Sequence, residues 1–336
     1  MKKVYIGHAA DSGIRFKSSS GGITTVVIKY LFDIGYIQSF LDCRFKEEEC
    51  RYEPCLIHDY KDYHHVGSVY QDLDLLKYLK RHISDIKGRI LIVCSPCLVK
   101  AMRNILKRHG IESIIIDYFC SGQTLIEGTY CYYKFIGIEK KEVVNIRYRG
   151  NGWPSGIEVC LRDGGRVYKD NYVEPWKTIH QSGLFRPRRC YYCKHIESKD
   201  ADMSVGDPWL KEYIDNDKEG NTLFIVHTDM GEKIVKDLIR LELINAYVVR
   251  DELFEISQFA TIQRKGSVDK EKTFYDFSLN LQTKNWYFNW AKKNLKNMRR
   301  HILLMQWVHK YFKCKGYTIN QIAVKIIYKI KQIQQK

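Results

Sequence analysis

The chain has 336 residues, of which 45% are hydrophobic and 28% are charged, a composition that excludes wholesale disorder. It contains no run of about 18 apolar residues and no export signal, so we expect a cytoplasmic protein without a membrane-spanning helix. Eleven cysteines are then reduced thiols or metal ligands rather than a disulfide framework. The formal charge of +16 is concentrated in the tail, because thirteen lysines and arginines and no acidic residue follow Asp276.

The first part of the chain predicts a strand at 4–7, a helix over 23–34, strands within 36–59 and a helix over 75–86. A serine- and glycine-rich turn precedes the first helix. Such a turn offers backbone N–H groups and hydroxyls to a phosphate, or it is an ordinary serine cap with flexible glycines. The turn is not a Walker loop, because no Gly-Lys-Ser/Thr follows it.

Two apolar strands, at 89–94 and 111–119, each run directly into a cysteine, namely Cys97 and Cys120. Continuous apolar runs of this kind are typical of buried parallel strands, whose carboxyl ends meet at one edge of a sheet. Further along, the pattern predicts a meander over 143–168, a strand at 224–227 and a helix over 231–241. We therefore expect an α/β body with an open mixed sheet and flanking helices over 1–266, followed by a basic helical extension over 267–336.

A Cys-x-x-Cys pair, Cys190 and Cys193, follows an arginine-rich approach whose cations favour thiolates. With Cys97 and Cys120 it gives four thiolates, which suit tetrahedral zinc or a [4Fe–4S] cluster. A second possible zinc site consists of Cys94, Cys97, Cys190 and Cys193. The third interpretation is that these cysteines are buried thiols that bind no metal. The other cysteines, Cys55 among them, are expected to be inert, and the His64-His65 pair is expected to lie at the surface.

Several short motifs occur in a specific order: Ser18-Ser19-Ser20-Gly21-Gly22-Ile23, Gly67-Ser68-Val69-Tyr70, Cys94-Ser95-Pro96-Cys97, Cys120-Ser121-Gly122, Arg147-Tyr148-Arg149-Gly150-Asn151-Gly152-Trp153, Arg186-Pro187-x-x-Cys190-x-x-Cys193 and Ser204-Val205-Gly206-Asp207-x-Trp209. This ordered set, over about two thirds of the chain, resembles the beta-subunit family of the deazaflavin-reducing (coenzyme F420) hydrogenases and dehydrogenases. Taken singly, Trp153 is more often a core residue than a platform for a cofactor, and Asp207 is as consistent with a strand end as with a functional role.

The resemblance implies an iron–sulfur flavoprotein that uses FAD and one [4Fe–4S] cluster. The family's cluster ligands and flavin contacts carry over residue by residue: by this resemblance Cys97, Cys120, Cys190 and Cys193 would hold the cluster, and Ser19, Ser20, Gly21 and Gly22 would contact the flavin. The chain departs from the family pattern at Val69, Cys94 and Ser121, where relatives have lysine, glycine and histidine, and this puts the usual substrate in doubt. No ferredoxin-like segment precedes the first motif, so we expect a separate electron donor such as a ferredoxin.

The resulting functional hypothesis is an oxidoreductase that passes electrons from a protein donor to a small organic substrate, in the setting of polysaccharide biosynthesis. The basic, aromatic tail suits an anionic membrane surface, at the inner face of the membrane, and no nucleic acid is expected because no nucleic-acid motif occurs. The alternative is a non-catalytic, zinc- or cluster-stabilised assembly protein at the membrane. The altered motif positions favour that alternative.

Overall fold

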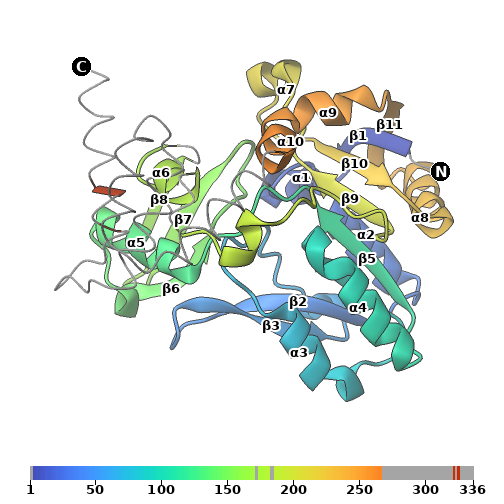
Figure 1. The fold of residues 1–336 in the computed structure, drawn as a ribbon, viewed down its shortest axis with the longest axis horizontal. Coiled ribbons are helices and arrows are strands. Elements are labelled where there is room, and N and C mark those ends of the chain that lie inside the picture. Colours follow the sequence, from blue (N-terminus) through green and yellow to red (C-terminus); the bar gives the residue numbers. More distant parts are fainter. Residues whose placement is uncertain (1–2, 171–172, 182–184, 267–320, 322–323, 326–336) are drawn as a thin grey trace, which may run out of the picture.

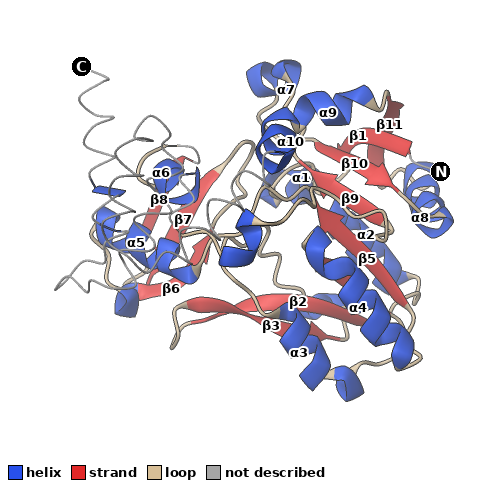
Figure 2. Ribbon diagram, viewed as in Figure 1, coloured by secondary structure: helices blue, strands red, loops and turns tan. Residues whose placement is uncertain are grey.

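The computed structural model describes residues 3–170, 173–181, 185–266, 321 and 324–325. These residues form a large sheet with helices on both faces and a small sheet at the other end of the molecule (Figure 1). Helices, strands and long connecting loops alternate along the chain (Figure 2). None of the helices in this part of the chain is long and apolar enough to cross a membrane.

The large sheet has eight strands in the order β11-β1-β10-β9-β5-β4-β2-β3. Parallel pairing joins β2, β4, β5 and β9, and the remaining neighbours are antiparallel. This arrangement confirms the predicted open mixed sheet. The strands are β1 (Lys3–Ala9), β2 (Ser39–Lys46), β3 (Arg51–Ile57), β4 (Ile90–Cys94), β5 (Ser113–Tyr118), β9 (Met203–Gly206), β10 (Thr222–Val226) and β11 (Ile244–Val249).

Helices cover the two faces of this sheet because its central strands are apolar on both. In β5, Ile114 and Ile116 pack toward α2 (Ile23–Asp33) and α8 (Asp229–Arg240). The intervening Ile115 packs toward α3 (Leu75–Arg81) and α4 (Pro96–Arg108) on the opposite face. Such two-sided burial is what a continuous apolar strand requires. The helix predicted over 75–86 is shorter, because α3 ends at Arg81 and a 3-10 turn, η2 (Ile83–Asp85), follows.

The small sheet contains β6 (Val143–Arg147), β7 (Gly156–Leu161) and β8 (Arg166–Asp170), and it confirms the predicted meander. It packs with α5 (Ile126–Ile136) and α6 (Trp176–Gln181) around a core that includes Tyr148 and Trp176. Most of the predicted extension over 267–336 lies outside the described residues. Val324, which is described, is fully buried in this same core.

The remaining elements are short helices and 3-10 turns. They are α1 (Ser12–Lys17), η1 (Tyr60–Asp62), η3 (Lys140–Glu142), η4 (Arg188–Tyr191), α7 (Lys211–Asn216), α9 (Glu252–Ser257) and α10 (Phe259–Gly266).

Candidate functional site

A large cavity of about 1390 Å³ lies where the loops of the two sheets meet. Its wall comes from the turn before α2, from β2 and the loop after η1, from the ends of β4 and β5, and from the segments around η4 and α10. Cations outnumber carboxylates in this wall: it contains Lys17, Arg147, Arg149, Arg186, Arg189, Arg264 and Lys265 against Asp11, Asp42 and Asp207. The cavity therefore favours an anionic occupant.

The four cysteines singled out from the sequence all line this cavity, although they come from three separate segments. Cys97 begins α4, Cys120 follows β5, and Cys190 and Cys193 are in and just after η4. Because β4 and β5 are parallel neighbours, their carboxyl ends bring Cys97 and Cys120 to the same edge. A backbone hydrogen bond of 2.9 Å from Cys120 to the carbonyl of Ile196 holds the segment after Cys193 against β5.

The sulfurs of these four cysteines influence one another electrostatically. The hydrogen bond between Cys97 and Cys193 lowers the pKa of the Cys193 thiol and raises that of the Cys97 thiol, so this pair retains one proton. Burial raises the pKa of Cys120. Lys265 is a cation that sequence reasoning missed: it is nearly fully buried, and its ammonium lies 3.8 Å from the sulfur of Cys193 and donates to the carbonyl of His195.

Cys94 does not join this group. Its side chain is fully buried in the core between the sheet and α4, with Val99 and Met102, and it does not line the cavity. Burial raises the pKa of its thiol well above the usual range. The alternative zinc set that included Cys94 is therefore not assembled in this fold.

The serine and glycine turn before α2 lies at the other side of the cavity, with Ser19, Ser20 and Gly22 in the wall. The hydroxyls of the two serines already have protein partners, since Ser19 Oγ accepts from the N–H of Ser68 at 2.7 Å and Ser20 Oγ lies 3.0 Å from Thr222 Oγ1. Gly22 has a φ of 84° and no side chain caps the helix that begins there. What this turn offers a ligand is thus the start of an 11-residue helix rather than free hydroxyls.

Gly21 is part of the same turn but is not in the cavity wall. Its N–H donates to Thr222 Oγ1 at 2.9 Å. An added Cβ would lie 2.6 Å from the carbonyl oxygen of Gly7, so the turn packs directly on β1. Sequence reasoning expected a flavin contact here, and the structure places the residue at a backbone-to-backbone contact instead.

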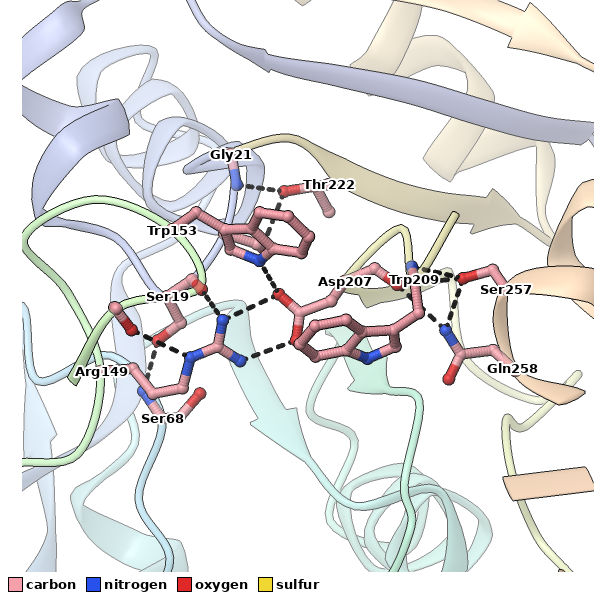
Figure 3. A network of polar contacts seen from close by, with 12 residues as sticks. Ser19, Gly21, Ser68, Arg149, Trp153, Asp207, Trp209, Thr222, Ser257 and Gln258 are labelled. Atoms are coloured by element: carbon pink, nitrogen blue, oxygen red, sulfur yellow. Dashed lines mark hydrogen bonds and ion pairs between the residues drawn. The ribbon is translucent and has the colours of Figure 1, made fainter. Parts of the chain in front are cut away.

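Several of the other motifs meet at one ion pair between Arg149 and Asp207 (Figure 3). The guanidinium donates two hydrogen bonds to the carboxylate, of 2.7 and 2.9 Å, and a third to the carbonyl of Ser19. The indole of Trp153 donates to the same carboxylate at 2.7 Å, and its ring lies 5.2 Å from that of Trp209. We call Arg149, Asp207, Trp153 and Ser19 the arginine latch, because they join the turn before α2, the loop after β6 and the end of β9.

Contact with Ser19 of the arginine latch explains the glycine at the start of the motif Gly67-Ser68-Val69-Tyr70. Gly67 has a φ of 69°, and an added Cβ would lie 2.8 Å from Ser19 Oγ. Only glycine allows the following N–H, that of Ser68, to reach this hydroxyl without strain. Of the three departures from the family pattern, Val69 and Ser121 line the cavity, whereas Cys94 lies in the core.

His180 is a cavity residue that sequence reasoning did not single out. Its ring stacks on Trp176 with a centroid separation of 5.8 Å and contacts Tyr70 of the Gly67 motif. Thr124 Oγ1 lies 2.8 Å from its Nδ1. Burial, reinforced by Arg186, lowers the pKa of His180 to about 4, so the imidazole is neutral near pH 7. Its signal in the sequence was weak, because no motif contains it.

Comparison with known proteins gives two results of different kinds. The family model described as coenzyme F420 hydrogenase/dehydrogenase, beta subunit N-term, matches residues 4–80, and the corresponding C-terminus model matches residues 87–251. Among solved structures, a chain of the F420-reducing [NiFe] hydrogenase complex from Methanosarcina barkeri is similar, with a TM-score of 0.60 and 14% identity over 80% of this chain and 91% of that chain. No match was found among the curated proteins.

Proposed function

Because the chain belongs to the coenzyme F420 hydrogenase/dehydrogenase beta-subunit family, we propose that it is an oxidoreductase whose cavity holds FAD beside a [4Fe–4S] cluster. The observation that carries the proposal is the convergence of Cys97, Cys120, Cys190 and Cys193 on the wall of one large basic cavity. When bound, the cluster would supply single-electron transfer and the flavin would supply hydride chemistry.

The family, rather than the spacing of the four cysteines, favours a cluster over zinc. Sulfurs of a tetrahedral zinc site lie roughly 3.8 Å apart, given Zn–S bonds of about 2.3 Å. Cys97 and Cys193 are in hydrogen-bond contact, and among the described residues no three of the four sulfurs are grouped within 4.8 Å of one another. A cubane of four irons separates its thiolate ligands further than zinc does, so the wider grouping of the remaining sulfurs is compatible with a cubane. Lys265 stabilises the negative charge of the thiolates by its position next to Cys193.

The shape and charge of the cavity support the flavin part of the proposal. The uncapped N-terminus of α2, at Gly22, faces the cavity and suits a pyrophosphate. The cations Lys17 and Arg147 lie in the same wall. The imidazole of His180 is neutral and could form a hydrogen bond to the flavin without adding a charge to the cavity wall. The same excess of cations would favour an anionic substrate, and a precursor of polysaccharide synthesis that carries phosphate has this chemistry.

The position of Cys97 supports a separate protein donor. Cys97 is exposed, and exposed cations surround the cysteine segments, namely Lys100, Arg189, Lys194 and Lys199. An acidic donor such as a ferredoxin would be attracted to this surface. Two single-electron deliveries from that donor, with one proton, balance the transfer of one hydride equivalent to the substrate. Attachment of the basic tail to an anionic membrane surface remains a prediction about residues outside the described part of the chain.

The test is to purify the full chain without oxygen and to measure its visible spectrum together with iron, sulfide, zinc and flavin content. We expect about four irons and four sulfides per chain and a flavin that is released on denaturation. Cys190→Ser should abolish most of the iron, while Cys160→Ser, a thiol on β7 that does not line the cavity, should leave it unchanged. A colourless protein with one zinc lost in Cys190→Ser would overturn the redox function and favour the non-catalytic alternative.

A further inference from the structure

A second group of metal-ligating side chains lies at the edge of the cavity, with two of its three members in the wall, and includes none of the four cysteines. Asp42 on β2 and Cys55 on β3 are direct cross-strand partners, so their side chains are on the same face of the sheet. His64, from the loop after η1, completes the group. One ligand atom of each of the three residues lies within 4.8 Å of the other two.

We propose that Asp42, Cys55 and His64 form a binding site for Zn²⁺. Zinc accepts carboxylate oxygen, thiolate sulfur and imidazole nitrogen, and three protein ligands with one position left open are typical of catalytic zinc sites. Asp42 and His64 line the cavity, so the open position would be accessible to water or to an oxygen of a small molecule. The site does not rest on the proposed flavin and cluster, because it shares no residue with either.

The geometry of Asp42 is the first argument for a cation. The residue is only 4% exposed, yet among the described residues His64 is the one basic side chain that pairs with it. Both the backbone N–H and the ring Nδ1 of His64 are directed at Asp42 Oδ2, at 3.1 and 2.8 Å. A plain histidine–aspartate hydrogen bond accounts for these two residues alone. The cross-strand register of β2 and β3 brings the Cys55 sulfur to the same point and so adds a third donor atom to the pair.

The loop that carries His64 is held in place, which is the second argument. The next residue, His65, has a φ of 49° in the left-handed region, and its ring lies 4.2 Å from that of Tyr63 and 5.7 Å from that of Tyr60. Backbone in this region persists when the surroundings enforce it, and such positions are concentrated at functional sites. The packed rings thus fix the direction in which His64 faces Asp42.

Charge balance is consistent with a divalent cation. A carboxylate and a thiolate together supply two negative charges, which one Zn²⁺ neutralises. Two cations on the same strand, Arg44 and Lys46, are exposed and half-buried, and within the described part of the chain neither forms an ion pair with Asp42. An open zinc in this position would bind and polarise an alcohol, carbonyl or phosphate oxygen of a cavity ligand. Sequence patterns do not predict this zinc site, because the three ligands are spread over 23 positions with no motif spacing.

The experiment measures binding of Zn²⁺, and of Co²⁺ as a spectroscopic probe, by equilibrium dialysis of the full chain without oxygen. It is run on the wild type and on a Cys190→Ser/Cys193→Ser variant, so that metal held by the four cysteines is counted separately. We expect one zinc per chain to remain in that variant. His64→Gln, Asp42→Asn and Cys55→Ser should each weaken its binding by at least about tenfold, and Co²⁺ should show a thiolate charge-transfer band that Cys55→Ser removes.

Two other residues provide matched controls. His109→Gln, at the exposed end of α4, and Cys43→Ser, next to Asp42 on β2, change the same residue types as two of the ligands and should leave zinc binding unchanged. His64 is one third exposed, so His64→Gln carries little risk to folding and decides the matter if Asp42→Asn unfolds. Zinc binding by His64→Gln that equals the wild type, or loss of all zinc in the Cys190→Ser/Cys193→Ser variant, would overturn the proposal.

Discussion

The arginine latch and the four cysteines are both built from motif residues that lie far apart in the sequence, but they differ in what completes them. The Arg149 guanidinium and the Asp207 carboxylate complete each other, with Trp153 and Ser19 taking the remaining hydrogen bonds. The thiols of Cys97 and Cys193 are hydrogen-bonded to each other, and the ammonium of Lys265 lies 3.8 Å from the sulfur of Cys193. The latch is completed by the protein alone, whereas the four cysteines line an open cavity, where we propose that they hold a cluster.

This contrast shows that a sequence motif does not by itself distinguish a structural role from a cofactor-binding role. The hydrogen-bond partners of its side chains must be known first. Arg149 and Asp207 line the cavity as the cysteines do. Their hydrogen bonds nevertheless show that they position the turn before α2 and the end of β9. We therefore expect the latch to govern the stability of the metal-free chain and the cysteines to govern its cofactor content.

The largest effect is expected from Asp207→Asn. The change removes the charge that compensates Arg149, whose side chain is only 3% exposed. Removal of one partner of a buried pair costs about 3–5 kcal/mol, because the other charge remains buried. Urea unfolding of the metal-free chain should show this loss. The control is Arg166→Ala, which breaks an exposed pair with Glu158 and should change stability by less than about 1 kcal/mol. Equal losses in the two variants would contradict a structural latch.

Trp153→Phe should give a smaller loss of the same kind. The substitution keeps an aromatic ring against Trp209 but removes the hydrogen bond from Nε1 to Asp207, which is 2.7 Å long. Hydrogen bonds to charged groups contribute about 1.5–3 kcal/mol, so we expect a loss of about 2 kcal/mol in the free energy of unfolding. In a double-mutant cycle with Asp207→Asn the two losses should be less than additive. Full additivity would mean that the indole acts by packing alone.

His180 gives the cavity wall a pH dependence. Burial lowers its pKa to about 4, below the value of about 6.5 expected for the unfolded chain. Between these values the unfolded state binds the extra proton, so the contribution to stability is complete above about pH 6.5 and declines as the pH falls toward 4. Because the ring borders an open cavity, we expect a decline of about 1–2 kcal/mol, measured as the change in unfolding free energy from pH 7 to pH 4.5.

A His180→Gln variant tests this assignment, since glutamine can still pair with Thr124 and does not titrate. Between pH 7 and pH 4.5 the unfolding free energy of this variant should fall by about 1–2 kcal/mol less than that of the wild type. His109→Gln, at the exposed end of α4, is the matched control and should follow the wild-type curve. Identical curves for the wild type and His180→Gln would show that the ring does not resist protonation.

Much of the fold could be predicted from the sequence, because apolar periodicity reports burial directly. The apolar runs of β4 and β5 predicted parallel strands, and their carboxyl ends correctly brought Cys97 and Cys120 to one edge. Sequence patterns could not show that Cys94 faces the core and not the cavity. Side chains along a strand alternate between its two faces, so the register of β4 decides which face its last residue occupies. His64 was expected at the surface and is exposed, but its hydrogen bond to Asp42 was not predicted.

The partners of His64 and of Trp153 could not be predicted for a common physical reason. Both depend on contacts across more than twenty residues, His64 with Asp42 and Trp153 with Asp207. Local patterns carry no information about such contacts. Cys55 illustrates the same limit, because only the cross-strand register of β2 and β3 places it opposite Asp42. The sequence identified the residue types that carry chemistry, and the topology decided which of them meet.

The smallest effect on the metal-free chain is expected from Cys190→Ser, and this result would separate the two regions most directly. Cys190 is 9% exposed, but serine is close in size, and within the described part of the chain the thiol makes no hydrogen bond that the substitution would remove. We expect the unfolding free energy of the metal-free protein to change by less than about 1 kcal/mol, whereas the protein purified without oxygen should lose most of its iron. Asp207→Asn should behave in the opposite way, with low stability in either form and with iron bound in proportion to the folded fraction. If Cys190→Ser instead destabilised the metal-free chain as much as Asp207→Asn, the cysteines would be part of the structural framework, and the distinction between a completed latch and an open donor set would fail.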